Sequence, residues 1–222
     1  MCGRFSLIDD LATLQETFRF EFGEEMVPRY NISPGQEILI IGKHEGKRVG
    51  AMMRWGLVPF WAKDPKIGYK MINARSEGID KKPSFKNAFK KRRVLIPCSR
   101  FYEWKQSDEG KLPYRFIMKG EKPFAFAGIW ETWTKGKSPL HSCSILTTQP
   151  NRVTKSVHDR MPVILHEKDY DIWMEPEYND ISTLMELLVP YEKEGMDTYR
   201  VSTLVNSSRN DFAEMISPLN SL

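Results

Sequence analysis

Cys2 is the first residue whose position suggests chemistry, because it directly follows the initiator Met1. A small second residue usually allows the methionine to be removed, and Cys2 would then carry a free α-amine beside its thiol. That amine has a pKa of about 7.7–8.0, so part of it is nucleophilic near pH 7. Such a 1,2-aminothiol condenses with an aldehyde to an imine and then closes a thiazolidine ring. By position alone, an accidental cysteine is the more frequent explanation.

Two other residues are candidates for proton transfer. His158 lies in a polar turn before an apolar stretch, and an imidazole titrates near neutral pH. Strand alternation places Glu103 on one face with Phe101 and Lys105, where apolar surroundings would raise the pKa of the carboxyl group. The alternatives are a surface histidine beside Asp159 and a cross-strand salt bridge for Glu103.

Amide, guanidinium and aromatic side chains suggest a binding surface. Asn73 can orient a polar intermediate and Arg75 can hold a phosphate, both at a predicted strand end. Trp55, Phe60 and Trp61 could stack on bases or wedge between them. A turn amide, a surface arginine and buried aromatic core remain alternatives, the last above all for Trp55.

The elements that must position these residues predict an α+β fold. Segments rich in β-branched and aromatic residues predict strands at 37–42, 48–55, 70–74, 93–97, 100–105, 114–119, 124–130, 141–148 and 161–165. Helical patterns lie near 84–91, 167–174, 180–189 and 211–216, and Asp9 or Asp10 can cap a helix with Leu11, Leu14 and Phe18 on its apolar side. Because helical crossovers do not regularly separate the strands, we expect a mixed, mostly antiparallel sheet or barrel-like core with peripheral helices.

Composition narrows the class of protein. The 222 residues are 41% hydrophobic and 28% charged, which suits one globular domain over 1–222 with no internal repeat or linker. No apolar run approaches the ~20 residues of a membrane span, and no secretory signal begins the chain, so we expect a cytoplasmic protein. Three cysteines without metal-binding spacing argue against disulfides and a structural metal.

The net charge of +4 is unevenly distributed. Residues 81–93 hold seven basic residues and no acid, whereas 166–197 are strongly acidic. A basic run is more often a solvated surface than a nucleic-acid site, so this run alone does not predict DNA binding.

Several spaced motifs together carry a resemblance that none carries alone. They are Met1-Cys2-Gly3-Arg4-Phe5, Pro28-Arg29-Tyr30-Asn31-Ile32-Ser33-Pro34, Arg54-Trp55-Gly56-Leu57-Val58-Pro59, Asn73-Ala74-Arg75-Ser76-Glu77, Phe101-Tyr102-Glu103-Trp104-Lys105, Phe126-Ala127-Gly128-Ile129-Trp130-Glu131, Thr147-Thr148 and His158-Asp159-Arg160-Met161-Pro162. From residue 1 to about 206 the chain resembles the SRAP (SOS response-associated peptidase) family of abasic-site processing proteins, which crosslink to damaged single-stranded DNA.

The resemblance implies a compact α+β fold with Cys2 at the floor of a basic groove. It implies that Cys2 is the nucleophile, that Asn73 holds its terminus, and that Glu103 and His158 transfer protons. The DNA-contacting residues that it implies are Arg4, Asn31, Trp61, Arg75, Thr148 and Arg160. Arg100 departs from the small residue of many relatives, and we expect its charge to lower the pKa of Glu103.

The implied function is a sensor and shield of abasic sites, which forms a thiazolidine crosslink through Cys2 after Met1 is removed. AP-lyase side activity and autoproteolytic removal of Met1 would accompany it. The implied partner is single-stranded DNA with abasic sites, including junctions with duplex, bound by a monomer without cofactor, metal or membrane, cytoplasmic and nucleoid-associated when on DNA.

Two other classes remain open at this point. An N-terminal-nucleophile amidohydrolase would share the Met-Cys-Gly start, but the later glutamine-binding signatures of that class are absent. A noncatalytic single-stranded DNA binding module would bind intact and abasic strands alike, with affinity that falls steeply with salt.

Overall fold

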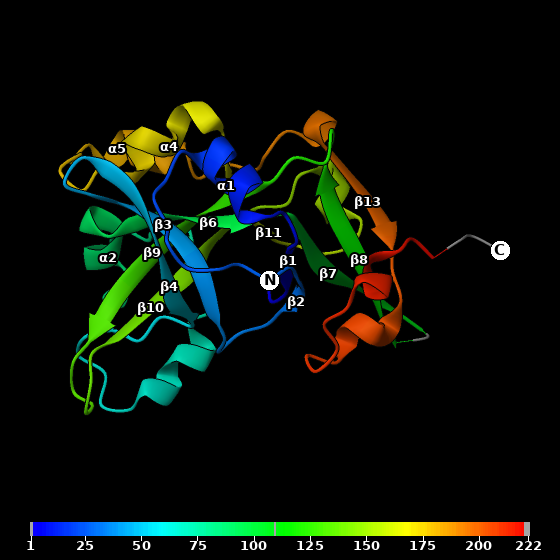
Figure 1. Ribbon diagram of the computed structural model, residues 1–222, viewed down its shortest axis with the longest axis horizontal. Coiled ribbons are helices and arrows are strands. Elements are labelled where there is room, and N and C mark those ends of the chain that lie inside the picture. Colours follow the sequence, from blue (N-terminus) through cyan, green and yellow to red (C-terminus); the bar gives the residue numbers. More distant parts are fainter. Residues whose placement is uncertain (1, 109, 220–222) are drawn as a thin grey trace.

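Two β-sheets that share an aromatic core form the centre of the computed structural model, which describes residues 2–108 and 110–219 (Figure 1). The first sheet has the order β13-β8-β7-β1-β2. Its strands are β1 (Phe5–Leu7), β2 (Arg29–Ile32), β7 (Arg100–Ser107), β8 (Gly110–Met118) and β13 (Met196–Arg200), and its pairings are antiparallel.

The second sheet follows the order β11-β10-β4-β3-β6-β9-β12. Its strands are β3 (Glu37–His44), β4 (Lys47–Trp55), β6 (Arg93–Cys98), β9 (Phe124–Trp133), β10 (Leu140–Thr148), β11 (Met161–Pro162) and β12 (Ile164–Leu165), with β5 (Asn73–Arg75) paired to β10. Because β10 also pairs with β9, strands β10, β4, β3, β6 and β9 close into a barrel. The β10 pairings with β4 and β5 are parallel, so the sheet is mixed.

Helices and 3-10 turns lie around this core. The α-helices are α1 (Leu11–Phe18), α2 (Lys86–Lys91), α3 (Arg152–Lys155), α4 (Tyr170–Met174) and α5 (Ile181–Glu186). The 3-10 turns are η1 (Pro65–Lys70), η2 (Glu167–Asp169), η3 (Lys193–Gly195), η4 (Thr203–Asn206) and η5 (Ala213–Ile216). The predicted α+β class, with a mixed and mostly antiparallel barrel and peripheral helices, is confirmed.

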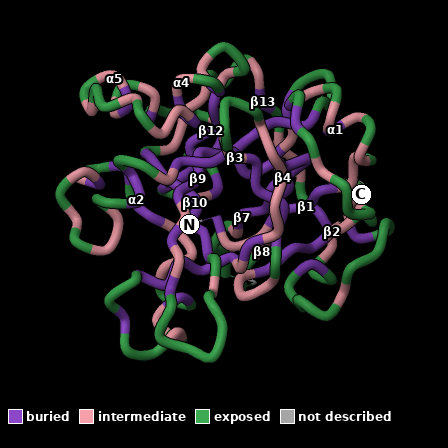
Figure 2. Tube along the Cα trace, turned by 60° about the vertical axis from the view of Figure 1, so that its left-hand side comes forward, coloured by how far each residue is buried: buried purple, intermediate pink, exposed green. Residues whose placement is uncertain are grey.

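The aromatic core joins the two sheets at Phe5. Its ring lies edge-on to Trp55 at 5.3 Å and to Phe126 at 5.9 Å between centroids, both in the barrel. Phe101 of the first sheet packs edge-on against the same Phe126 and stacks on Phe116 at 4.7 Å. Figure 2 shows this region as the buried centre of the molecule, with exposed loops outside it. The start of the chain is therefore an integral part of the core.

Local signals located several elements correctly. The side chain of Asp10 accepts a hydrogen bond from the backbone N–H of Thr13 at 2.7 Å, and Leu14 and Phe18 are buried, as predicted for the first helix. Two predictions were wrong in detail. Residues 65–70 form a 3-10 turn before the short strand that begins at Asn73, and 213–216 form a 3-10 turn instead of an α-helix.

Three strands and one α-helix carried no clear sequence signal, namely β1, β2, β13 and α3. Each is short, and pairing with a distant segment stabilises the strands more than their own propensity does. Among the described residues, no helix has both the length and the apolarity needed to cross a membrane.

Gly56 and Gly68 allow the two backbone segments that carry them to approach each other closely. A Cβ built on Gly68 would lie 2.5 Å from the carbonyl oxygen of Gly56, and a Cβ on Gly56 would lie 2.8 Å from that of Gly68. Gly56 also has a φ of 130°, a backbone conformation that residues other than glycine rarely adopt. This contact fixes the segment that carries Trp61 against the barrel.

We predict that Gly68→Ala lowers the free energy of unfolding by about 1–3 kcal/mol or more, because the added methyl meets backbone that cannot move aside. Urea denaturation measures the change. Gly23→Ala is the matched control, since a Cβ on Gly23 meets nothing within 4 Å. Equal stability of the two variants would contradict the close-approach explanation.

Candidate active site

Cys2 lies at the bottom of the site, fully buried, just before β1. The backbone N–H of Tyr102 donates to the carbonyl of Arg4 at 3.0 Å, which extends the β1–β7 pairing toward the chain start. The side-chain amide of Asn73, on β5, donates to the carbonyl of Cys2 at 2.8 Å. Burial raises the pKa of the Cys2 thiol far above its usual range, and the nearby charge of Glu103 acts in the same direction.

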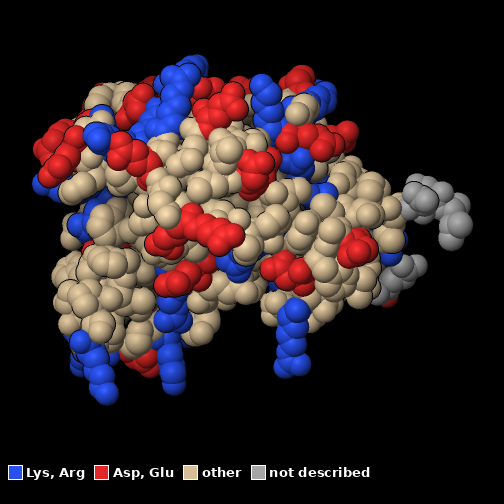
Figure 3. Space-filling model, in the orientation of Figure 1, with Lys and Arg blue, Asp and Glu red and all other residues tan. Residues whose placement is uncertain are grey.

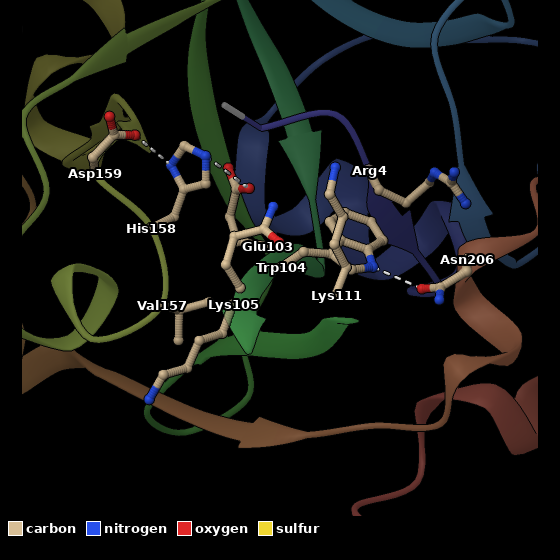
Figure 4. A pocket seen from close by; sticks show the side chains of 10 residues that line it. Arg4, Glu103, Trp104, Lys105, Lys111, Val157, His158, Asp159 and Asn206 are labelled. Atoms are coloured by element: carbon tan, nitrogen blue, oxygen red, sulfur yellow. Dashed lines mark hydrogen bonds and ion pairs between the residues drawn. The ribbon is translucent and has the colours of Figure 1, made fainter. Parts of the chain in front are cut away.

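Glu103 and His158 meet beside Cys2. Glu103 is 2% exposed, and burial raises its pKa to about 7. His158, in the turn after α3, places its Nε2 atom 3.9 Å from the Oε2 atom of Glu103 and its Nδ1 atom 3.0 Å from the Oδ1 atom of Asp159 (Figure 4). Burial lowers the pKa of His158 below its usual value. A protonated acid and a neutral base therefore coexist near neutral pH.

A cavity of about 770 Å³ opens over these groups. The residues that line it are Arg4, Glu103, Trp104, Lys105, Gln106, Lys111, Val157, His158, Asp159 and Asn206. A second cavity of about 490 Å³ shares Val157, His158 and Asp159 and adds Gln149, Pro150 and Lys155. Basic side chains outnumber acidic ones in the larger cavity, while the smaller cavity has Lys155 against Asp159. The larger cavity reaches down to Glu103, whose charge acts on the neighbouring Cys2, and its basic side chains suit a polyanion.

Sequence reasoning missed part of the cavity wall. Trp104 donates from its Nε1 atom to the Oδ1 atom of Asn206 at 2.7 Å, which brings η4 to the rim of the cavity (Figure 4). Lys105 could be expected at the cavity, because strand alternation places it on the same face of β7 as Glu103. Asn206 is about a hundred residues away in the chain, and no local pattern connects it with the site.

Arg4 and Asn31 hold this C-terminal wall in place. The Nη1 atom of Arg4 donates to the Oδ1 atom of Asn31 and to the carbonyl of Val205, both at 2.7 Å. The amide of Asn31, which is 1% exposed, donates to the carbonyls of Ser207 and Asn210 at 2.9 and 2.7 Å. Both side chains thus have structural partners in the protein itself.

Thr148 and Arg160 are also engaged in the interior. The hydroxyl of Thr148 donates to the carbonyl of Leu188 at 3.0 Å. The guanidinium of Arg160 forms a two-pronged ion pair with Glu77 at 2.5 and 2.9 Å and donates to the carbonyl of Thr147 at 2.7 Å. This arrangement anchors the turn that carries His158 to the edge of the barrel.

Trp61 and Arg75 differ from the other expected DNA contacts because both are exposed. Trp61 is 42% exposed, in the segment fixed by Gly56 and Gly68, and its carbonyl accepts a hydrogen bond from Lys135 at 2.7 Å. Arg75 lies at the end of β5, two residues after Asn73. Their side chains are free to meet a ligand that leaves the cavity.

The basic run at 81–93 does not form one uniform surface. Arg93 is 3% exposed and donates to the carbonyls of Trp173 and Phe89 at 2.7 and 2.8 Å, and Arg92 pairs with Glu131 at 2.6 Å. For the molecule as a whole, Figure 3 shows basic and acidic side chains intermixed along the upper edge, with several basic side chains that project from the lower edge. Part of the run therefore stabilises the fold.

The expected effect of Arg100 on Glu103 was wrong. The pKa of Glu103 is raised, while Arg100 donates to the carbonyl of Ser99 at 2.5 Å and pairs with Glu121 at 3.1 Å. Residues 100 and 103 are three apart on β7, so their side chains leave opposite faces of the strand. The positive charge of Arg100 is therefore directed away from Glu103.

The predicted catalytic residues thus come together from four separate segments of the chain. Among residues 2–108 and 110–219, no group of three or more His, Cys, Asp or Glu is arranged to hold an ion. The prediction that Met1 is removed concerns a residue outside the described ones.

Comparison with known proteins defines the class. The profile of the SOS response associated peptidase (SRAP) family matches residues 1–208. The chain belongs to this family, as its motifs predicted.

Named relatives and solved structures agree with this assignment. The chain is 46% identical to abasic site processing protein YoqW of Bacillus subtilis, over 97% of this chain and 99% of that protein. It is 32% identical to abasic site processing protein HMCES of Gallus gallus, over 86% of this chain and 66% of that one. A crystal structure of a Bacteroides thetaiotaomicron protein shares the fold, with a TM-score of 0.89 at 24% identity over 98% of this chain and all of the other.

The ion pair of Glu77 with Arg160 predicts a pH dependence of stability. The hydrogen bonds from Arg160 lower the pKa of Glu77 to about 2 from 4.5. A lowered carboxyl pKa stabilises the folded state above pH 4.5, and that contribution is lost as the pH falls toward 2. Glu77→Gln should lower the free energy of unfolding at pH 7 by roughly 1–2 kcal/mol, since the half-exposed carboxylate is partly screened.

Urea denaturation at several pH values measures this effect. The difference between wild type and Glu77→Gln should shrink as the pH falls toward 2, because the carboxylate of the wild type becomes protonated there. Glu16→Gln, at an exposed position of α1, is the matched control. A difference that is constant with pH would contradict the ion-pair origin.

Proposed function

We propose that this protein processes abasic sites in single-stranded DNA by capturing their open aldehyde at Cys2. The observation that carries the proposal is the convergence of Cys2, Asn73, Glu103 and His158 under a cavity with a basic wall. The names of the relatives, abasic site processing proteins, support the same substrate.

The first step is opening of the sugar ring, because an abasic site is mostly a cyclic hemiacetal. In our scheme the protonated Glu103 donates a proton to the ring oxygen, while the Nε2 atom of His158 accepts the proton of the hydroxyl on the neighbouring carbon. The carbon–oxygen bond of the ring breaks and the aldehyde forms. The opposite pKa shifts of Glu103 and His158 keep both in the required protonation state near pH 7.

Capture follows at the chain start. After Met1 is removed, the amine of Cys2 attacks the aldehyde carbon, and loss of water leaves an imine. The sulfur then bonds to the same carbon, and the thiol proton passes to the nitrogen as the C=N double bond becomes single. The product is a thiazolidine, with no other group released.

Asn73 supports the orientation of that amine. Its Nδ2 atom holds the carbonyl of Cys2, and its Oδ1 atom is buried without a hydrogen-bond partner among the described residues. An unpaired buried acceptor is costly, and the amine freed by removal of Met1 is a suitable donor for it. This role agrees with the sequence expectation that Asn73 holds the terminus.

The buried thiol also explains how the crosslink would shield the lesion. The imine acidifies the adjacent sugar carbon, so slow ring closure would allow strand cleavage by β-elimination. A thiol held beside the imine carbon closes the ring first. Lyase activity is then a side reaction, and removal of Met1 proceeds either by this site or by a host aminopeptidase.

The path of the DNA follows from the exposed groups. Arg75 is the last residue of β5 and Lys155 the last residue of α3. Lys105 and Lys111 lie on the first sheet, at the larger cavity. The exposed Trp61 can stack at a junction with duplex. Arg160, Asn31 and Thr148 act in this scheme by shaping the groove from within. We further propose that residues 1–222 act as one domain and as a monomer in the cytoplasm.

Replacement of Cys2 tests the proposal most directly. We predict that wild type forms a denaturation-resistant conjugate with abasic single-stranded DNA and that Cys2→Ala forms none, as seen on denaturing gels with abasic and intact oligonucleotides. Cys143→Ala, which removes an equally buried thiol, is the control and should crosslink normally. A noncatalytic binding module would give no conjugate with any variant, and an amidohydrolase would release ammonia from glutamine.

The pH dependence of capture tests the proton-transfer pair. The rate should fall above about pH 7 as Glu103 ionises, and also at low pH as His158 becomes charged. Glu103→Gln should slow capture by about 10²-fold and remove the high-pH fall, because an amide does not ionise. An unchanged profile in Glu103→Gln would show that another group supplies the proton.

A further inference from the structure

The turn after α3 brings two different groups to one nitrogen of His158. The Oδ1 atom of Asp159 lies 3.0 Å from Nδ1, and the backbone N–H of Arg160 donates to the same Nδ1 at 3.1 Å. The other nitrogen, Nε2, faces Glu103 at 3.9 Å. In Figure 4 the side chains of Asp159, His158 and Glu103 follow one another from the outside of the cavity inward.

The two contacts at Nδ1 require opposite states of that nitrogen. The N–H of Arg160 needs a lone pair on Nδ1, which puts the proton of the neutral ring on Nε2. The negative charge of Asp159 favours a proton on Nδ1, which leaves the lone pair on Nε2. The stronger of the two contacts therefore decides which nitrogen faces the cavity as a base.

Charge favours the contact with Asp159. The carboxylate of Asp159 carries a full negative charge 3.0 Å from Nδ1, whereas the backbone amide of Arg160 is a neutral dipole, so a proton on Nδ1 gains more from Asp159 than it loses against the amide. The side chain of Asp159 is 89% exposed, so water weakens this advantage without removing it. The amide of Arg160 stays in place in either state, because Glu77 and Thr147 anchor that residue.

We propose that Asp159 is a positioning residue that keeps the proton of neutral His158 on Nδ1, so that Nε2 accepts protons from the cavity. The inference rests on the proposed role of His158 in ring opening. When Nε2 takes the hydroxyl proton of the sugar, the ring becomes a cation that donates from Nδ1 to Asp159. The proton on Nε2 is returned in the later steps, and Asp159 remains ionised throughout.

Other charges around the ring do not reproduce this effect. The titratable groups that face the two cavities from neighbouring elements are Glu103, Lys105 and Lys111 on the first sheet, Arg4 before β1, and Lys155 on α3. Glu103 lies on the Nε2 side. Among the described residues that line these cavities, Asp159 is the carboxylate in contact with Nδ1.

Long-range ¹H–¹⁵N NMR of the imidazole ring in the free, mature protein tests the inference without DNA. At a pH where His158 is neutral, wild type should show the proton on Nδ1. Asp159→Ala should show it on Nε2, because the amide of Arg160 then keeps the lone pair on Nδ1. Asp159→Glu should restore much of the wild-type signature. Asp197→Ala, at an exposed position of β13, is the control for loss of a surface charge.

Crosslinking to abasic DNA provides the functional readout. Asp159→Ala should slow capture by about tenfold or more, with recovery in Asp159→Glu, because the base has been turned into a donor. A wild-type ring protonated on Nε2, or an unchanged ring in Asp159→Ala, would overturn the inference. If wild type forms no crosslink, the proposed function fails, and the NMR result still decides the state of the ring.

Discussion

Burial of the chain's first residues between two sheets is the constraint on which the site depends. Phe5 packs against Trp55 and Phe126, and the pairing of β1 with β7 continues to the carbonyl of Arg4. Together these contacts place Cys2 beside Glu103 with little freedom to move. A reactive chain terminus would otherwise be mobile, since terminal residues are ordered only when they are tied down.

The same burial sets the electrostatics of the site. Desolvation raises the pKa of Glu103 and of the Cys2 thiol, and it lowers that of His158. Near pH 7 the free protein therefore holds a neutral thiol, a partly protonated carboxyl group and a neutral imidazole in one place. In the function proposed above, nucleophilic capture requires proton movement within the site, and the groups around His158 would provide it.

Several side chains that were expected at DNA have hydrogen-bond partners within the protein. Asn31 ties the C-terminal segment to the first sheet, and Arg160 ties the histidine turn to the barrel. Arginine and asparagine are the residue types expected at phosphates, yet they are equally suited to satisfying buried carbonyls. Burial distinguishes the two uses, and composition does not.

The sequence by itself determined the family, the α+β class, a helix cap at Asp9 or Asp10 and the four residues of the candidate catalytic group, because motifs and alternation are local patterns. Only the tertiary structure decided the closing of the barrel, the places of β1 and β13, the direction of Arg100 and the presence of Asn206 at the cavity. These features depend on contacts between segments far apart in the chain, and local propensity carries no information about such contacts.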